Sequence, residues 1–110
     1  MSKEVVFLGD SLEVLKDFPE ETRISMGHAL REAQEGGKAL YAKPLKGIGG
    51  GATVIEICDD YDGNTYRVMY TVKIGSKLYV LHAFQKKSQQ TAKMDIELAK
   101  VRYRMIGGKS

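Results

Sequence analysis

Apolar residues near the N-terminus predict one strand followed by two helices. A short apolar run over residues 4–8 predicts the strand. Leu12, Leu15 and Phe18 recur at three-residue spacing and predict the first helix, which a proline directly afterwards ends. A second helix is expected to run from there to a glycine pair, Gly36-Gly37.

Polar residues indicate how these helices begin. Asp10 or Ser11 can cap the first helix, because a side-chain oxygen there accepts a free backbone N–H of the first turn. The second helix opens with Glu20 and Glu21, whose negative charges suit a helix N-terminus. Its apolar positions are Ile24, Met26, Leu30 and Ala33.

The hydrophobic period changes to two after residue 53. Three segments alternate or are rich in β-branched and aromatic residues: 54–59, 66–72 and 78–84. Asp62-Gly63-Asn64 and Gly75-Ser76 between them are turn sequences. The pattern therefore predicts an antiparallel meander, whereas residues 38–53, with Pro44 and several glycines, are expected to be irregular.

Alternation along the strands assigns side chains to faces. Arg67 and Met69 are expected on one face of the middle strand, and Tyr66, Val68 and Tyr70 on the other. On the last strand, one face is expected to carry Leu78, Val80, His82 and Phe84.

The C-terminal segment predicts a helix. Its apolar stripe, at i, i+4, i+7 and i+11, consists of Met94, Leu98, Val101 and Met105, with Thr91 or Ser88 as the expected cap. The order is therefore β-α-α-β-β-β-α, an α+β fold with helices packed on one face of a small antiparallel sheet. The whole chain, residues 1–110, is expected to form one domain.

Composition narrows the class of protein. No apolar run approaches the ~18 residues that span a bilayer. Asp10 and Glu13 interrupt the N-terminal apolar run too early for a signal peptide, so a cytoplasmic protein without membrane contact is expected. The single cysteine fits a reducing compartment. Together with two histidines at scattered positions it does not make a zinc site, and no metal or other cofactor is expected.

The charge is unevenly distributed along the chain. The formal total is +3, but residues 1–60 carry a net charge of −4 and residues 61–110 a net charge of +7. Such asymmetry favours a polyanionic partner for the second half.

Basic residues on or just after the meander are the first candidates for contact with that partner. They are Arg67, Lys73, Lys77, Lys86 and Lys87. Tyrosines and Phe84 lie among them, and aromatic faces with cations suit single-stranded nucleic acid. The alternative is that the lysines serve solubility and edge protection and that the tyrosines pack in the core.

Other candidate groups also allow two interpretations. Lys43 and Lys46 lie in a loop whose glycine-rich stretch lacks the P-loop ending, and either meet a polyanion or are simply solvated. Glu56 with the nearby aspartates could suggest a metal site, but turn chemistry and an ion pair with a neighbouring arginine are favoured. His82 is either a satisfied core histidine or a catalyst, and Cys58 is expected to be a small buried hydrophobe.

Several motifs together resemble a known family. They are Lys43-Pro-Leu-Lys-Gly47, Tyr66-Arg-Val-Met-Tyr70, the run from Phe84 to Thr91 and the segment Glu97–Arg102. In this order the chain resembles the phage-derived, HigB-like branch of the RelE/ParE toxin superfamily, over about residues 4–105. The resemblance implies a ribosome-dependent endoribonuclease that cuts mRNA, needs no cofactor, and is neutralised by a cognate antitoxin, often a helix-turn-helix protein.

Under that resemblance the candidate residues acquire roles. Arg67 would stabilise the transition state, because its planar fork matches phosphate oxygens, and Lys86 or Lys87 would position the scissile phosphate. Neighbouring cations could lower the pKa of these lysines. The candidates for proton transfer are Tyr70, His82 and Lys46, and those for RNA binding are Lys43, Lys46, Lys73, Arg102 and Arg104.

Two other functions are compatible with the same fold but involve no RNA cleavage. A ParE-like inhibitor of DNA gyrase would use the basic half to bind protein or DNA, with Arg67 an ordinary strand residue. An inactive relative would retain antitoxin binding alone. Fold does not select among the three, because function depends on the site.

Overall fold

The computed structural model describes residues 3–38, 41–45, 48, 54–72, 75–86 and 93–106. The elements follow one another as β1 (Glu4–Phe7), α1 (Ser11–Lys16), α2 (Glu20–Gln34), β2 (Ala42–Leu45), β3 (Val54–Tyr61), β4 (Asn64–Thr71), β5 (Lys77–Lys86) and α3 (Lys93–Met105). Within these ranges no helix is long and apolar enough to cross a membrane.

The five strands form one mixed sheet in the order β1-β5-β4-β3-β2. The meander β3-β4-β5 is confirmed, but β1 joins β5 in parallel, so the expected antiparallel sheet is wrong at this edge. The expectation of an irregular stretch is also wrong over Ala42–Leu45, which pairs with β3. Pro44 is tolerated there because β2 is an edge strand.

The β3–β4 connection confirms the turn prediction. Tyr61 pairs with Asn64 across the loop, and both central residues have positive φ, 52° at Asp62 and 82° at Gly63. Positive φ at both positions is the signature of a two-residue turn whose twist matches that of the paired strands.

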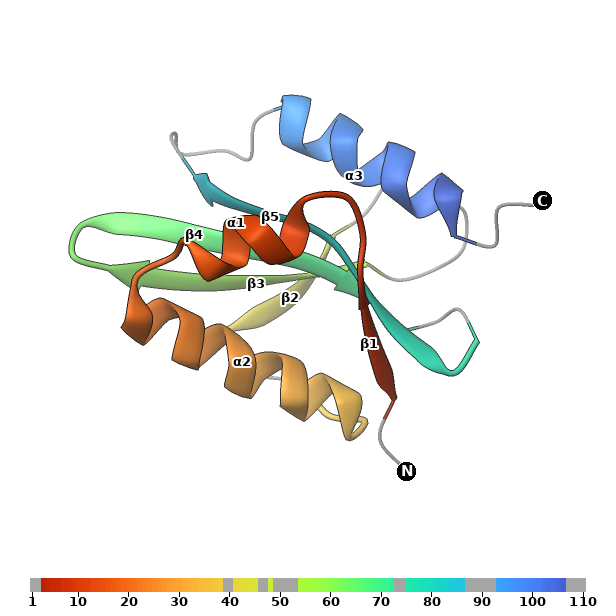
Figure 1. The fold of residues 1–110 in the computed structure, drawn as a ribbon, viewed down its shortest axis with the longest axis horizontal. Coiled ribbons are helices and arrows are strands. Elements are labelled where there is room, and N and C mark those ends of the chain that lie inside the picture. Colours follow the sequence, from red (N-terminus) through yellow and green to blue (C-terminus); the bar gives the residue numbers. More distant parts are fainter. Residues whose placement is uncertain are drawn as a thin grey trace.

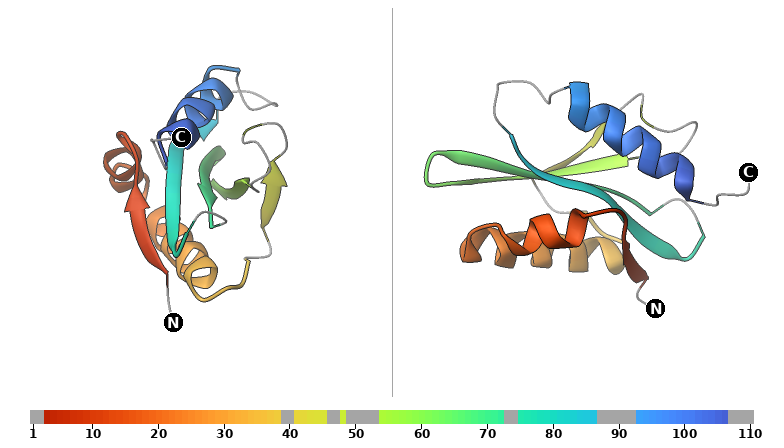
Figure 2. Two further views of the ribbon diagram at one scale, coloured as in Figure 1. Left: turned by 90° about the vertical axis from the view of Figure 1, so that its right-hand side faces the viewer. Right: turned by 45° about the horizontal axis from the view of Figure 1, so that its top comes forward.

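Helices cover both faces of the sheet, not one as expected. In Figure 1 α3 lies above the sheet and α2 lies below it, and the right-hand view of Figure 2 shows α1 beside α2, on the side of the sheet opposite to α3. The larger core, called here the α1/α2 core, joins Phe18, Met26 and Leu30 to Val68 and Tyr70 of the sheet. A smaller core, on the α3 side, contains Ile48, Val54, Met69, Leu81, Phe84 and Ala99.

A β-bulge in the β4–β5 pairing decides which β5 side chains face α3. The register shifts between Met69, opposite His82, and Tyr70, opposite Val80, so Leu81 is opposite no residue of β4. Leu78 and Val80 lie in the α1/α2 core, whereas His82 and Phe84 lie on the α3 side. The prediction that these four side chains share one face of the sheet is therefore wrong, because the bulge shifts the alternation by one residue.

The apolar stripe of the last helix does not face the core. Met94, Val101 and Met105 are 78%, 45% and 59% exposed, while the buried residues of α3 are Ala99 and Arg102. Helical period placed the stripe on one face correctly, but it could not indicate which face meets the sheet. In the N-terminal helices, Met26, Leu30 and Ala33 are buried as expected, but Ile24 and Leu12 are exposed.

Arg102 holds α3 to the loop before α1. Its Nη1 donates to the Leu81 carbonyl oxygen at 3.0 Å, and its Nη2 donates to Asp10 Oδ1 at 2.9 Å. The guanidinium lies so close to Gly9 that a Cβ there would be 2.4 Å from Cζ. The expected cap is absent, since neither Asp10 nor Ser11 makes a capping bond: Asp10 binds Arg102, and the Ser11 hydroxyl donates to the Val80 carbonyl.

The Asp10–Arg102 pair predicts an acid-dependent loss of stability. The hydrogen bond from Arg102 holds the pKa of the Asp10 carboxyl below its usual value. A carboxyl whose folded pKa is lowered stabilises above its unfolded pKa, and that contribution disappears as pH falls through the folded pKa. Asp10→Asn is thus expected to cost up to ~1 kcal/mol near neutral pH, because Asp10 is largely solvated, and nothing once the pH is below the folded pKa.

Urea unfolding of both proteins at several pH values measures this difference. Asp17→Asn, at the exposed end of α1, is the matched control and is expected to show no such trend. An Asp10→Asn deficit that persisted unchanged at low pH would contradict the ion-pair explanation.

Candidate functional site

The α3 side of the sheet carries an unusually polar set of side chains, called here the polar face. Residues that pair across antiparallel strands share a face, so the register places Lys43, Glu56, Met69 and His82 in one row. The next row is Cys58, Arg67 and Phe84, and the third is Asp60, Thr65 and Lys86. The strands thus bring together groups that lie far apart in the sequence.

Arg67 and Glu56 form a buried ion pair at the centre of the polar face. Arg67 Nη1 donates to Glu56 Oε1 at 2.7 Å, and their side chains are 10% and 1% exposed. The predicted pairing of Glu56 with a neighbouring arginine is confirmed. The charge of Arg67 is therefore balanced by a carboxylate, so the two form a polar centre without a large excess of positive charge.

His82 is held by Asp95, which lies in the first turn of α3. The distance from His82 Nε2 to Asp95 Oδ1 is 2.7 Å, and the imidazole stacks on Phe84 with ring centroids 4.8 Å apart. A carboxylate only accepts hydrogen bonds, so this contact assigns the ring proton to Nε2 and leaves Nδ1 as an acceptor in the neutral imidazole.

Two enclosed nitrogens of this face have no hydrogen-bond partner among the described residues. They are Arg67 Nε and His82 Nδ1, on side chains that are at least nine-tenths buried. Arg67 pairs with Phe84, two positions from His82, so the two residues occupy diagonal positions about 7–8 Å apart. An unsatisfied buried polar group costs about 1–3 kcal/mol, and in native proteins such groups mark strain, a catalytic role, or a place for a bound water or ion.

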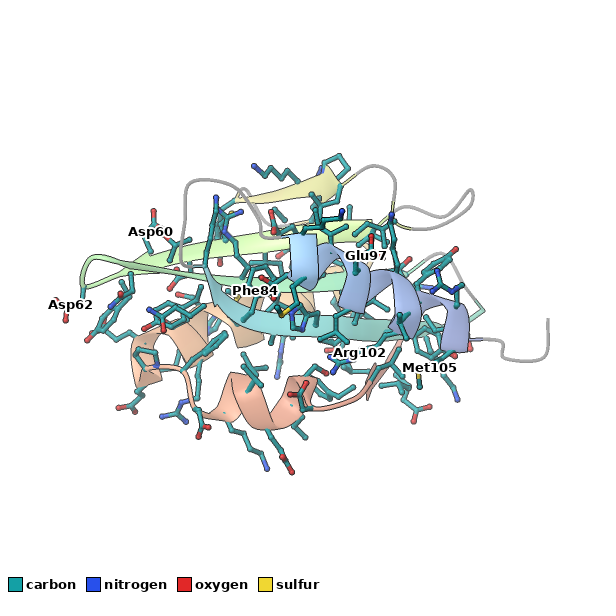
Figure 3. The ribbon with its side chains drawn as sticks, turned by 90° about the horizontal axis from the view of Figure 1, so that it is seen from above. Asp60, Asp62, Phe84, Glu97, Arg102 and Met105 are labelled. Atoms are coloured by element: carbon teal, nitrogen blue, oxygen red, sulfur yellow. The ribbon has the colours of Figure 1, made fainter. Side chains whose placement is uncertain are left out.

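Lysines lie at the edges of the polar face. Lys43 is exposed on β2, and Lys86 is half-buried at the end of β5. Figure 3 looks onto this face: Phe84 lies beside the first turn of α3, and Asp60 lies farther along the sheet, away from the helix. Nearby, the Thr65 hydroxyl donates to Asp60 Oδ1 at 2.7 Å.

Some predicted site residues are not brought to this face. Tyr70 is 2% exposed in the α1/α2 core, on the opposite side of the sheet, where burial raises the pKa of its hydroxyl. Arg102, expected to bind RNA, is buried and bonded within the fold, so that expectation is corrected. Arg104 is exposed on α3. Three further candidates, Lys46, Lys73 and Lys87, lie outside the described residues, as do the expected caps Ser88 and Thr91.

Cys58 is half-buried on the polar face, less enclosed than the expected buried hydrophobe. Burial raises the pKa of its thiol, so the neutral form dominates and the thiol is a poor nucleophile. In the described ranges no three His, Cys, Asp or Glu side chains gather as metal ligands would.

Asp95 is the site residue that the sequence interpretation missed. Its only visible signal is an acidic residue in the first turn of a helix, which is ordinary at helix N-termini. Its contact with His82 depends on the β5 bulge and on which face of α3 meets the sheet, and neither is readable from periodicity.

Comparison with protein families places the chain in one group. Residues 13–104 match the family model of phage-derived Gp49-like proteins (DUF891), which lies in the RelE/ParE-like toxin group. A comparison with curated protein sequences found no significant match. Since the family model covers most of the chain, including α2, the meander and nearly all of α3, the chain belongs to the Gp49-like family of phage-derived, toxin-like proteins.

Proposed function

We propose that this protein is the toxin of a type II toxin–antitoxin module and acts as a HigB-like, ribosome-dependent mRNA endoribonuclease in the cytoplasm. Membership of a toxin family implies an antitoxin partner in general. The helix-turn-helix class of that antitoxin, and the ribosome and mRNA as targets, belong to the proposal. One observation carries it: Arg67 and His82 are buried at diagonal positions, each with a nitrogen that has no hydrogen-bond partner within the described part of the chain.

RNA cleavage needs the chemistry that these two groups can supply. The 2′-hydroxyl loses a proton and attacks the adjacent phosphorus, while the departing 5′-oxygen gains a proton. His82 Nδ1, with Nε2 engaged by Asp95, is in the tautomer that accepts a proton. Arg67 can donate from Nε to a phosphate oxygen and stabilise the charge that gathers there.

The lysines act as secondary groups in this proposal. Lys43 and Lys86, at the edges of the polar face, guide the RNA backbone, and Lys87, Lys46 and Lys73 extend that role beyond the described residues. Arg104 is exposed and could contact RNA or ribosome. The unpaired nitrogens are enclosed in the free protein, so contact with a phosphate requires neighbouring side chains to move, as in binding by induced fit.

A translation reaction with primer extension on the message tests the proposal. The wild-type protein is expected to cut mRNA only when ribosomes are translating it. His82→Gln is expected to lower the cleavage rate by roughly 100-fold or more, the usual size of a general acid–base contribution. The matched control is His28→Gln, which changes the other histidine of the chain, exposed on α2.

The possible outcomes distinguish the role of His82 from the endoribonuclease activity itself. Equal losses in the His28 and His82 variants would contradict a specific role for His82. Cleavage at full rate by His82→Gln would reject His82 while leaving the endoribonuclease intact. A message that stays whole with active wild-type toxin would reject the endoribonuclease itself.

The second candidate function is a ParE-like inhibitor of DNA gyrase. The observation in its favour is that Arg67 already has a buried carboxylate partner, as an ordinary strand residue would. Inhibited DNA supercoiling together with intact message would support it. In that case the polar-face variants would leave inhibition unchanged unless they unfold the protein.

A further inference from the structure

The exposed apolar stripe of α3 has the spacing of a coiled-coil seam. Met94, Leu98, Val101 and Met105 follow one another at intervals of four, three and four residues, which are the d-a-d-a positions of two heptads. Three of the four side chains are between 45% and 78% exposed. In Figure 1 this helix forms the outer layer of the molecule above the sheet. The face therefore has the pattern of a helix that packs against another helix.

Charged residues beside the stripe indicate which helix that is. Glu97 and Arg104 are exposed and seven residues apart, so both occupy the g position of the heptad on the same edge of the stripe. They carry opposite charges. In an antiparallel pair the g edges of the two helices face each other, so a helix with one acidic and one basic g residue can match a reversed copy of itself.

In such an antiparallel pair a two-fold axis passes through the middle of the seam. If Met94 lies opposite Met105 of a second copy, Leu98 lies opposite the second copy's Val101, and the four apolar residues form two symmetric layers on each side of the axis. Glu97 then lies about 3 Å along the axis from Arg104 of the other copy, by a rise of ~1.5 Å per residue. The same contact occurs twice, because a two-fold interface is self-complementary.

We propose that the protein forms a symmetric dimer through antiparallel packing of α3 on α3 of a second copy, with Glu97 and Arg104 pairing across the axis. The interface is small, since each helix has 13 residues, so the dimer is expected to form at micromolar concentration and to dissociate on dilution. This inference does not depend on the enzymatic proposal. It connects to the polar face only through Asp95, which the same helix presents to His82 on its other side.

Charge reversal tests the register directly. By analytical ultracentrifugation, Glu97→Arg and Arg104→Glu are each expected to raise the dimer dissociation constant by ~10-fold or more, because each creates two like-charge contacts. The double variant Glu97→Arg/Arg104→Glu restores opposite charges and is expected to restore the dimer. Val101→Glu, in the middle of the seam, is expected to abolish it. Circular dichroism confirms that each variant is folded.

Cysteine cross-linking tests the orientation. In a Cys58→Ala background, Met94→Cys/Met105→Cys is expected to give a covalent dimer on mild oxidation. Met94→Cys alone is expected to give none, because the two copies of position 94 lie ~16 Å apart in the antiparallel pair. Cross-linking by the single variant would indicate a parallel pair and overturn the proposal.

Three results would overturn the inference. They are a wild-type protein that stays monomeric at all accessible concentrations, a dimer whose dissociation constant is unchanged by the charge reversals, and a double variant that stays dissociated. A monomer whose purified complex with the antitoxin is lost on Val101→Glu would assign the stripe to the antitoxin instead. None of these results bears on mRNA cleavage, which is measured separately.

Discussion

Glu56→Ala is expected to lower the free energy of unfolding by about 3–5 kcal/mol, the usual cost of removing one partner of a buried ion pair. The carboxylate is 1% exposed, and its loss leaves the enclosed Arg67 guanidinium without the oxygen that Nη1 contacts at 2.7 Å. Arg67 cannot reduce this cost by losing its proton, because the guanidinium group remains charged at any working pH. Urea unfolding followed by circular dichroism measures the loss.

Two further variants identify the origin of that loss. Glu4→Ala removes a solvated carboxylate 3.9 Å from Lys77 and is expected to change stability by less than ~0.5 kcal/mol. Glu56→Leu/Arg67→Met removes both charges together and is expected to recover most of the stability, since apolar replacements of a buried pair are often neutral. A double variant as unstable as Glu56→Ala would show that packing, and not the unpaired charge, causes the loss.

The double variant also separates folding from function. It keeps the sheet but lacks the arginine that the proposal assigns to the phosphate. A folded Glu56→Leu/Arg67→Met protein that still cut mRNA at the wild-type rate would exclude a role for Arg67 in the reaction.

Gly9→Ala is the second large effect, with an expected loss of about 2–5 kcal/mol. Gly9 has a φ of +57°, and a Cβ there would lie 2.4 Å from Cζ and 2.5 Å from Nε of Arg102. The guanidinium would have to move, which breaks its bonds to the Leu81 carbonyl and to Asp10 and loosens α3 from the sheet.

Gly75→Ala provides a control with nearly the same backbone conformation. Gly75 has a φ of +62°, and no atom of the described residues lies within 4 Å of a Cβ built there. This variant is expected to cost only the strain of a left-handed residue, about 1 kcal/mol. Equal losses at the two glycines in thermal or urea unfolding would contradict a contribution from Arg102.

The meander could be predicted from sequence because its signals are local. Two-residue alternation, β-branched residues and an Asp-Gly turn act within a few positions, and the turn at Asp62 and Gly63 has the expected positive φ angles. Alternation also separates Tyr70 from Arg67 correctly, and this alone removes Tyr70 from the set of groups that can act with Arg67.

The remaining parts of the fold depend on contacts between distant segments. β2 is a strand because an edge of β3 was available to it, despite its proline. The position of His82 depends on the bulge at Leu81, which no local pattern indicates. The burial of Arg102 depends on Asp10, 92 positions away. The candidate site was therefore predictable in its strand residues and not in its helical partner Asp95.

The parallel pairing of β1 with β5 has a consequence for the order in which the protein folds. The first strand finds its partner only after the whole meander has been synthesised, and α3 reaches Asp10 later still. Contacts of such sequence separation form slowly, because a long loop must close before they contribute. Newly made chains are therefore expected to collapse first around β3 and β4. The polar face is expected to be completed last, when α3 packs on the sheet and Asp95 contacts His82.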